Sequence, residues 1–124
     1  MTVRPARAMT WVPLAIALCL AAPYQAQGSL ITAFNDGMTK ARTEVTMCAV
    51  TYHIPSGARI STRVIVKANE RRPNKVWVAS PLDRRNSDLY TEDFKNCVKT
   101  AIVQNADFKG AHAYWDERFT FQAP

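Results

Sequence analysis

Residues 59–68 read RISTRVIVKA, and apolar and polar side chains alternate along this stretch. The apolar positions fall on one side of the chain and the polar ones on the other: Ile60, Val64 and Val66 against Arg59, Ser61, Arg63 and Lys67. Because successive side chains of a strand point to opposite faces, this period of two predicts a β-strand with one buried face. The stretch is also rich in β-branched residues, which favour strands.

Two further strands are predicted next to this one. Residues 45–54 (VTMCAVTYHI) also alternate, and one face of that segment would collect mainly apolar side chains, namely Cys48, Val50, Tyr52 and Ile54. Residues 55–57 (PSG) are typical of a turn between the two strands. A charged loop at residues 70–74 leads to a short third strand at residues 76–79.

A helix is predicted on each side of this meander. Residues 29–41 place apolar side chains at helical spacing, with Ser29 as the N-cap. Gly37 lies inside this helix and weakens it relative to alanine. Thr91 is the expected N-cap of a second helix, which ends near Gln104 and has acidic residues in its first turn.

A closing strand is predicted at residues 118–122, where Phe119 and Phe121 share a face that should be buried under a helix. The predicted order is therefore α-β-β-β-α-β. This order indicates an α+β fold, with a small antiparallel sheet and two helices packed on one face. The length of residues 27–124 suits a single domain.

Residues 1–26 have the features of a cleavable signal peptide. Arg4 and Arg7 precede an apolar run at residues 10–22, after which the chain becomes polar. A permanent membrane anchor is the alternative, but the run is shorter than the roughly 20 residues that cross a bilayer as a helix. We therefore expect cleavage after Ala26 and a periplasmic or secreted protein whose mature form has no transmembrane segment.

The mature chain would keep two cysteines, Cys48 and Cys97. An even number of cysteines in an exported chain favours a disulfide. Cys48 is predicted on the apolar face of its strand and Cys97 on the apolar stripe of the second helix, so both sulfurs would point into one interface. Two free buried thiols are the alternative.

The sequence contains no nucleophile elbow, phosphate-binding loop or zinc-protease motif. Its two histidines, His53 and His112, could serve a secreted ribonuclease as base and acid. However, His53 is predicted on the outward face of a strand and His112 in a loop. His112 and Asp116 are four residues apart, but they have no obvious third metal ligand. We expect a non-enzymatic protein without a cofactor or metal.

Basic residues are concentrated between residues 59 and 85, where only Glu70 and Asp83 oppose them. Six of these basic residues form a candidate basic patch: Arg59, Arg63, Lys67, Arg71, Arg72 and Lys75. The patch is either a solvated face that guards a sheet edge or a binding surface for an acidic protein, lipid headgroup or glycan. Nucleic acid suits the charge, but it is disfavoured because Trp77 is the only nearby aromatic residue and the compartment is extracytoplasmic.

Three stretches resemble the C-terminal domain that TonB and TolA share: residues 48–57 (CAVTYHIPSG), 94–101 (FKNCVKTA) and 115–124 (WDERFTFQAP). The resemblance implies a cystine between the first strand and the second helix, which would map onto Cys48 and Cys97. The segment at residues 67–89 is longer than the corresponding connection in that family. The sequence also shows no membrane anchor followed by a long stalk, so a free-standing copy without the energy-transducing role is implied.

The resemblance also implies a protein-binding function. In that family an exposed sheet edge accepts an extended segment of a partner. This edge maps onto Arg118, Phe119, Thr120 and Phe121, although residues 76–79 could cover or replace it. The partner would be another envelope or secreted protein, and the oligomeric state stays open. A small periplasmic inhibitor or immunity protein that blocks an enzyme or toxin is the alternative, followed by a secreted hydrolase.

Overall fold

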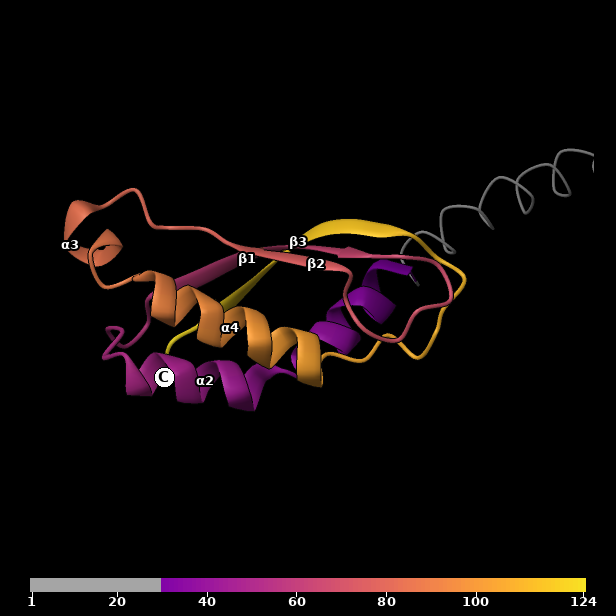
Figure 1. Cartoon of the computed structure of the whole chain (residues 1–124), viewed down its shortest axis with the longest axis horizontal. Coiled ribbons are helices and arrows are strands. Elements are labelled where there is room, and N and C mark those ends of the chain that lie inside the picture. Colours follow the sequence, from indigo (N-terminus) through magenta and orange to yellow (C-terminus); the bar gives the residue numbers. More distant parts are fainter. Residues whose placement is uncertain (1–29) are drawn as a thin grey trace, which may run out of the picture. The chain divides into compact units, whose positions relative to one another are not determined.

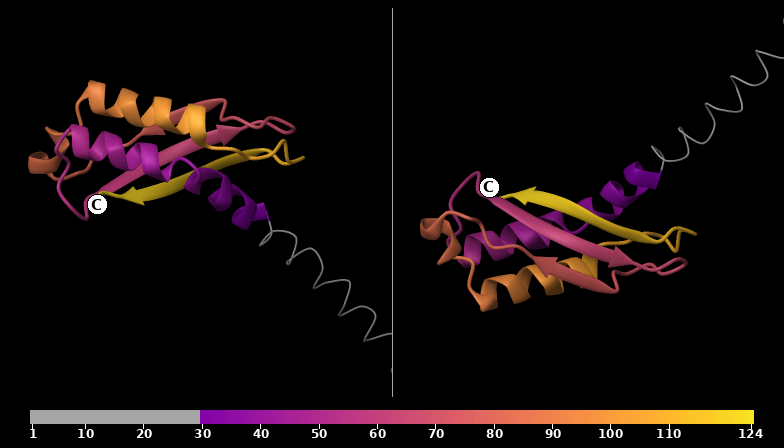
Figure 2. Two further views of the ribbon diagram at one scale, coloured as in Figure 1. Left: turned by 90° about the horizontal axis from the view of Figure 1, so that it is seen from below. Right: turned by 90° about the horizontal axis from the view of Figure 1, so that it is seen from above.

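The computed structural model describes residues 30–124 (Figure 1). The predicted signal peptide at residues 1–26 and its cleavage site lie outside the described residues. The described chain contains four helices and a three-stranded antiparallel sheet, which confirms the predicted α+β class. Residues 33–124 form one compact unit, in which helices α2 and α4 lie on one face of the sheet (Figure 2).

The sheet has the strand order β2-β1-β3. The central strand is β1 (Arg59–Val66), and it lies between the short β2 (Lys75–Val78) and the longer β3 (Trp115–Gln122). All eight residues of β1 pair with β3, whereas four of them pair with β2. Within residues 30–124, each outer strand therefore keeps one edge without a strand partner.

The alternation in β1 determines which face of the sheet is buried. Its even-numbered side chains are buried and its odd-numbered ones are half-buried or exposed, as the sequence predicts. Directly paired residues share a face, so Phe121 lies beside Ile60 on the buried side and Thr120 lies beside Ser61 on the other. We call these sides the helix face and the open face of the sheet.

Residues 42–51 form a helix, α2 (Arg42–Thr51), and the strand predicted at residues 45–54 is wrong. The helix at residues 30–39 and α2 are followed by β1, β2, α3 (Arg84–Ser87), α4 (Glu92–Asn105) and β3. The predicted order α-β-β-β-α-β therefore has one strand too many and two helices too few. The burial pattern shows the helical period: Val45, Cys48 and Ala49 are buried, whereas Met47 and Val50 are exposed. Side chains three and four residues apart thus share the buried face.

Residues 52–54, the last part of the predicted strand, instead terminate α2. The N–H of Ile54 donates to the carbonyl of Ala49 at 2.9 Å, and the N–H of His53 donates to that of Val50 at 3.2 Å. These two bonds define a Schellman motif, in which glycine usually takes the left-handed position. Here His53 takes it, with a φ of 57°. His53 therefore lies just beyond a helix and not on the outward face of a strand.

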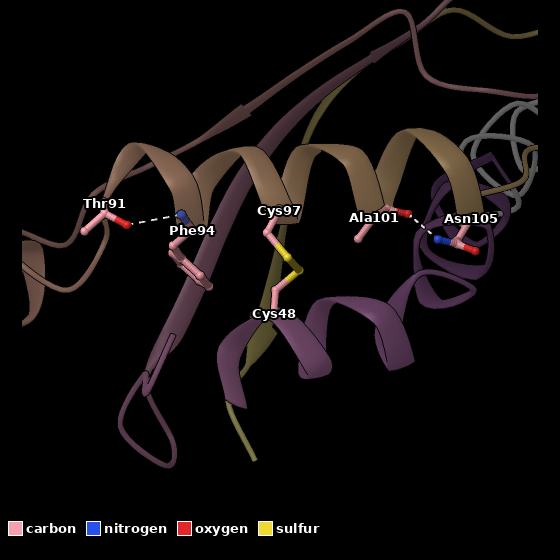
Figure 3. The surroundings of a disulfide bond; sticks show 6 residues. All are labelled: Cys48, Thr91, Phe94, Cys97, Ala101 and Asn105. Carbon is pink, nitrogen blue, oxygen red and sulfur yellow. Dashed lines mark hydrogen bonds between the residues drawn. A yellow bond between two sulfur atoms is a disulfide. The ribbon is translucent and has the colours of Figure 1, made fainter. Parts of the chain in front are cut away.

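A disulfide between Cys48 and Cys97 joins α2 to α4 (Figure 3). The predicted pairing is confirmed, but the bridge connects two helices instead of a strand and a helix. The predicted cap of α4 is also confirmed, since the N–H of Phe94 donates to the Thr91 hydroxyl at 3.2 Å. The disulfide thus holds α4 against α2, and the cap pairs a backbone N–H in the first turn of α4.

We expect Cys97→Ser to lower the free energy of unfolding by about 2–5 kcal/mol, because the bridge closes a long loop and restricts the unfolded chain. The two cysteines are 49 residues apart in sequence. Urea unfolding of the variant and the oxidised wild type, both produced from residue 27 onward, measures the difference. Thiol labelling of the unreduced wild type should find no free cysteine. A reactive thiol in the native protein would contradict the prediction.

Gly37 lies inside the helix at residues 30–39 because the ring of Phe108 rests against it. A Cβ atom at this position would lie 2.5 Å from Cδ1 of Phe108 and 3.0 Å from the carbonyl oxygen of Asp107. The Phe108 ring also stacks on Phe34, with ring centroids 5.6 Å apart, so its position is fixed from two sides.

We therefore expect Gly37→Ala to destabilise the protein by about 1–3 kcal/mol through overpacking. Helix propensity alone favours alanine by up to about 1 kcal/mol, so the expected sign is opposite to the one that propensity gives. The exposed Asn35 in the same helix provides the control, and Asn35→Ala should be neutral or stabilising. Denaturant unfolding compares the variants, and a stabilised Gly37→Ala protein would contradict the packing argument.

The connection between β2 and α4, for which the polar, proline-containing residues 80–89 predict a loop, contains the short helix α3. Its N-cap Asp83 accepts a hydrogen bond from the N–H of Arg85 at 3.1 Å. β3 begins at Trp115, three residues earlier than predicted, and this extends its pairing with β1. Within residues 30–124, no helix is both long enough and apolar enough to cross a membrane.

Candidate functional site

The outer edge of β3 is the longest unpaired strand edge in residues 30–124. The N–H of Ala123, just beyond β3, donates to the carbonyl of Ala58 at 2.9 Å. Backbone groups of an antiparallel strand alternate in direction, so the odd-numbered residues of β3 bond to β1. The even-numbered residues of β3 direct their N–H and C=O groups away from the sheet: Asp116, Arg118, Thr120 and Gln122.

Two hydrogen bonds on β1 agree with this assignment. The Ser61 carbonyl accepts the N–H of Ala79 on the β2 side at 2.9 Å, so the backbone groups of Ser61 point away from β3. The hydroxyl of Thr62 donates to the carbonyl of Phe119 at 2.8 Å, so that carbonyl points toward β1. Thr120, which lies opposite Ser61, therefore has its backbone groups available to a partner, while its exposed hydroxyl lies 3.4 Å from that of Ser61.

The four predicted edge residues have different surroundings. Phe121 is buried, with 4% of its surface exposed, whereas Phe119 is only half-buried, which corrects the expectation that both rings lie under a helix. Arg118 and Thr120 are exposed on the open face. β2 pairs with the opposite side of β1, so residues 76–79 do not cover the edge of β3.

A groove of about 530 Å³ lies beside the C-terminal end of β3. Residues from α2, β1 and β3 line it: Arg42, Thr46, Arg59, Thr120, Phe121 and Gln122. Arg42 and Thr46 are four residues apart on α2, so they lie on the same side of that helix. Figure 2 shows α2 beside this end of β3 in the view from below. The groove lining contains two guanidinium groups and no carboxylate.

Two arginines of the predicted basic patch are bound to acidic side chains. Arg63 donates to both carboxylate oxygens of Asp116, at 2.8 and 2.7 Å, and its guanidinium carbon lies 4.9 Å from the ring centroid of Trp77. Arg71 donates to both carboxylate oxygens of Asp107, at 3.2 and 2.6 Å. These bonds hold the pKa of both carboxyl groups below their usual range. The first pair thus joins β1 to β3, and the second joins the connection between β1 and β2 to the connection that follows α4.

Of the other four residues of the patch, one is bound to a backbone carbonyl and three have no acidic partner in the described part of the chain. Arg72 donates to the carbonyl of Ala106 at 2.8 Å and so holds two loops together. Arg59, Lys67 and Lys75 form no ion pair with any residue of the described part of the chain. The predicted patch is therefore a set of structural contacts with three free cations.

The residues considered for catalysis or metal binding are not brought together. His53 follows α2 and His112 lies in the connection to β3, and both are exposed. The carboxylate of Asp116 is bound to Arg63. Among residues 30–124, no group of three histidine, cysteine, aspartate or glutamate side chains could hold a metal ion.

The sequence does not single out Arg42 and Thr46, which line the groove. The strand predicted at residues 45–54 leaves Arg42 outside any element. Once residues 42–51 are helical, the spacing of four brings the two side chains onto one side of α2. A prediction of a helix at residues 42–51 would therefore have placed Arg42 and Thr46 together.

The described residues thus form a small disulfide-bonded α+β domain with one long open strand edge and a basic groove beside it. Comparisons with known protein families, with curated proteins and with solved structures found no match. The functional argument therefore depends on the geometry of this chain.

Proposed function

We propose that the protein is a non-enzymatic periplasmic binding module that takes up an extended segment of a partner protein as a fourth strand beside β3. The observation that carries this proposal is the unpaired edge of β3, with backbone donors and acceptors pointing away from the sheet at every second residue. β3 contains no proline that would block pairing. An open edge of this kind is a ready template for an additional strand.

The surroundings of this edge support a selective partner. In strand addition, main-chain hydrogen bonds provide affinity for any extended segment, and neighbouring pockets provide selectivity. The half-buried Phe119 leaves part of an aromatic ring available to an apolar side chain of the added strand. The groove at Arg42 and Thr46 provides polar contacts two residues further along β3.

The resemblance to the C-terminal domain of TonB and TolA supports the same proposal, since partners of that family join an exposed sheet edge. The partner would be another envelope or secreted protein, and the protein would act as an accessory of an envelope, transport or secretion system. The periplasmic location in this proposal comes from the predicted signal peptide at residues 1–26.

Residue-resolved amide hydrogen exchange tests the proposal, with a partner isolated by co-purification from the periplasm. In the free protein, we expect the amides of Arg118 and Thr120 to exchange fast and those of Glu117 and Phe119 to exchange slowly. Binding should slow exchange at Arg118 and Thr120 and change the other two little. This alternation is the signature of an added strand, because only every second amide points toward it.

Other exchange patterns would contradict strand addition. Slower amide exchange on partner binding without alternation along β3 would favour an inhibitor or immunity protein, particularly if the partner were a hydrolase or toxin. An enzymatic activity lost in His53→Ala or His112→Ala would favour a secreted hydrolase instead.

A further inference from the structure

We infer that the segment added to β3 is acidic and that a carboxylate of this segment binds in the groove formed by Arg42 and Arg59 (the arginine groove). The inference rests on the proposed function and specifies the chemistry of the partner. It also assigns a binding role to Arg42, which lies outside every predicted site.

The charge of the arginine groove is not compensated within the described residues. Arg42 and Arg59 are exposed and form no ion pair with any residue between 30 and 124. Arg63 and Arg71, in contrast, each bind a carboxylate through two nitrogen atoms. A guanidinium group offers five N–H donors in a planar fork that matches a carboxylate. The groove therefore suits an acidic group supplied from outside.

The geometry of strand addition brings side chains of the partner to this groove. A neighbouring strand lies about 4.8 Å from β3, and its side chains alternate between the two faces of the sheet. A residue opposite Phe121 would project on the helix face, on the side where Arg42 and Thr46 line the groove. Its neighbours would project on the open face, where Arg59 is paired with Gln122. A carboxylate on the helix face would therefore lie near Arg42, and one on the open face would lie near Arg59.

The charges on the helix face favour the same end of β3. Glu117, which pairs with the buried Val64, places an exposed carboxylate on this face in the N-terminal half of β3, where it repels an acidic side chain. The exposed Arg118 lies on the open face, so it attracts acidic side chains there and not on the helix face. On the helix face, repulsion by Glu117 and attraction by Arg42 therefore set the register of an acidic segment.

Peptide selection tests this inference. The probe is a phage-displayed library of random twelve-residue peptides, selected against the protein purified from the periplasm. We expect the recovered peptides to be enriched in aspartate and glutamate. The enrichment should disappear in a selection against the double variant Arg42→Gln/Arg59→Gln.

The double variant Lys67→Gln/Lys75→Gln is the matched control. It also removes two cations that have no acidic partner within residues 30–124, but neither lines the arginine groove. Selection against this control should still recover acidic peptides. Neutralising Arg42 should leave the fold intact, because a cation in the first turn of a helix is unfavourable with the helix dipole.

A synthetic copy of a recovered peptide provides the quantitative measurement. Arg42→Gln and Arg59→Gln should each weaken its binding about tenfold, which corresponds to ~1.4 kcal/mol. Added salt should weaken binding to the wild type more than binding to the double variant, since exposed charges are screened.

Three results would overturn the inference: peptides without acidic enrichment, no recovered peptide, or acidic peptides that bind the double variant at full strength. Selection against Thr120→Pro separates the inference from the proposed function. Non-acidic peptides that fail to bind Thr120→Pro would leave strand addition intact and reject only the acidic partner. Acidic peptides that bind Thr120→Pro unchanged would reject both.

Discussion

Thr120→Pro is expected to abolish binding of the partner segment while the protein remains folded. The N–H of Thr120 points away from β1, so a proline removes a donor that only an added strand would use. The threonine side chain is exposed, and its replacement removes only the 3.4 Å contact between its hydroxyl and that of Ser61 on the open face. Proline is tolerated on an edge strand where the N–H faces solvent, which is the situation at this position.

Glu117→Pro is the matched control. Its side chain is also exposed, but its N–H points toward β1 and pairs with Val64. The proline would leave a carbonyl group of the central strand unpaired, at a cost of about 1–3 kcal/mol in folding free energy. The main difference between the two variants is the direction of the N–H group that the proline removes, and we expect a stability loss mainly for Glu117→Pro.

Circular dichroism and urea unfolding establish whether both variants are folded, and titration with the partner isolated from the periplasm measures binding. Thr120→Ser keeps the backbone donor and should bind like the wild type. A folded Thr120→Pro protein that binds at full strength would show that strand addition at this edge is wrong. That result would favour an inhibitor or immunity protein.

Phe121→Ala is expected to lower the free energy of unfolding by about 3–5 kcal/mol, the typical cost of a buried phenylalanine truncation. Phe121 is 4% exposed and lies opposite Ile60 on the helix face. Its ring also packs edge-on against Phe119, with centroids 4.8 Å apart. The variant would lose this contact and leave a cavity beneath the sheet.

Phe119→Ala is the natural comparison, because the half-buried Phe119 ring leaves a smaller cavity when it is removed. We expect a loss below about 3 kcal/mol for this variant. Urea unfolding of both variants under the same conditions measures the two values. Equal losses would contradict the difference in burial that the structure shows.

Several elements were predictable because their signals are local. The alternation in β1 follows directly from the period of a half-buried strand, and the structure has the same buried face. The cap of α4 depends on Thr91 and on the residue three positions later. The disulfide partners, Cys48 and Cys97, were the only cysteines left after residue 26.

The prediction failed at α2 because its apolar residues fit both the period of two of a strand and the three-to-four spacing of a helix. Cys48 and Tyr52 fit the alternation of a strand, but they also continue a helical stripe at spacings of four and three: Phe34, Met38, Ala41, Val45, Cys48 and Tyr52. All members of the stripe except the partly buried Tyr52 are buried. Packing of α2 against α4 and β3 decided between the two periods, and such contacts are not visible in a local pattern.

The sequence by itself determined the α+β class, the strand β1 with its buried face, the helix α4 and the cysteine pair, because each depends on neighbouring residues or on composition. Only the tertiary structure decided which arginines are free. Arg63 and Arg71 are bound to acids 53 and 36 residues away in sequence, whereas Arg42 and Arg59 are left without an acidic partner in residues 30–124. The open edge of β3 was likewise decided by the order β2-β1-β3, because strand order depends on long-range pairing.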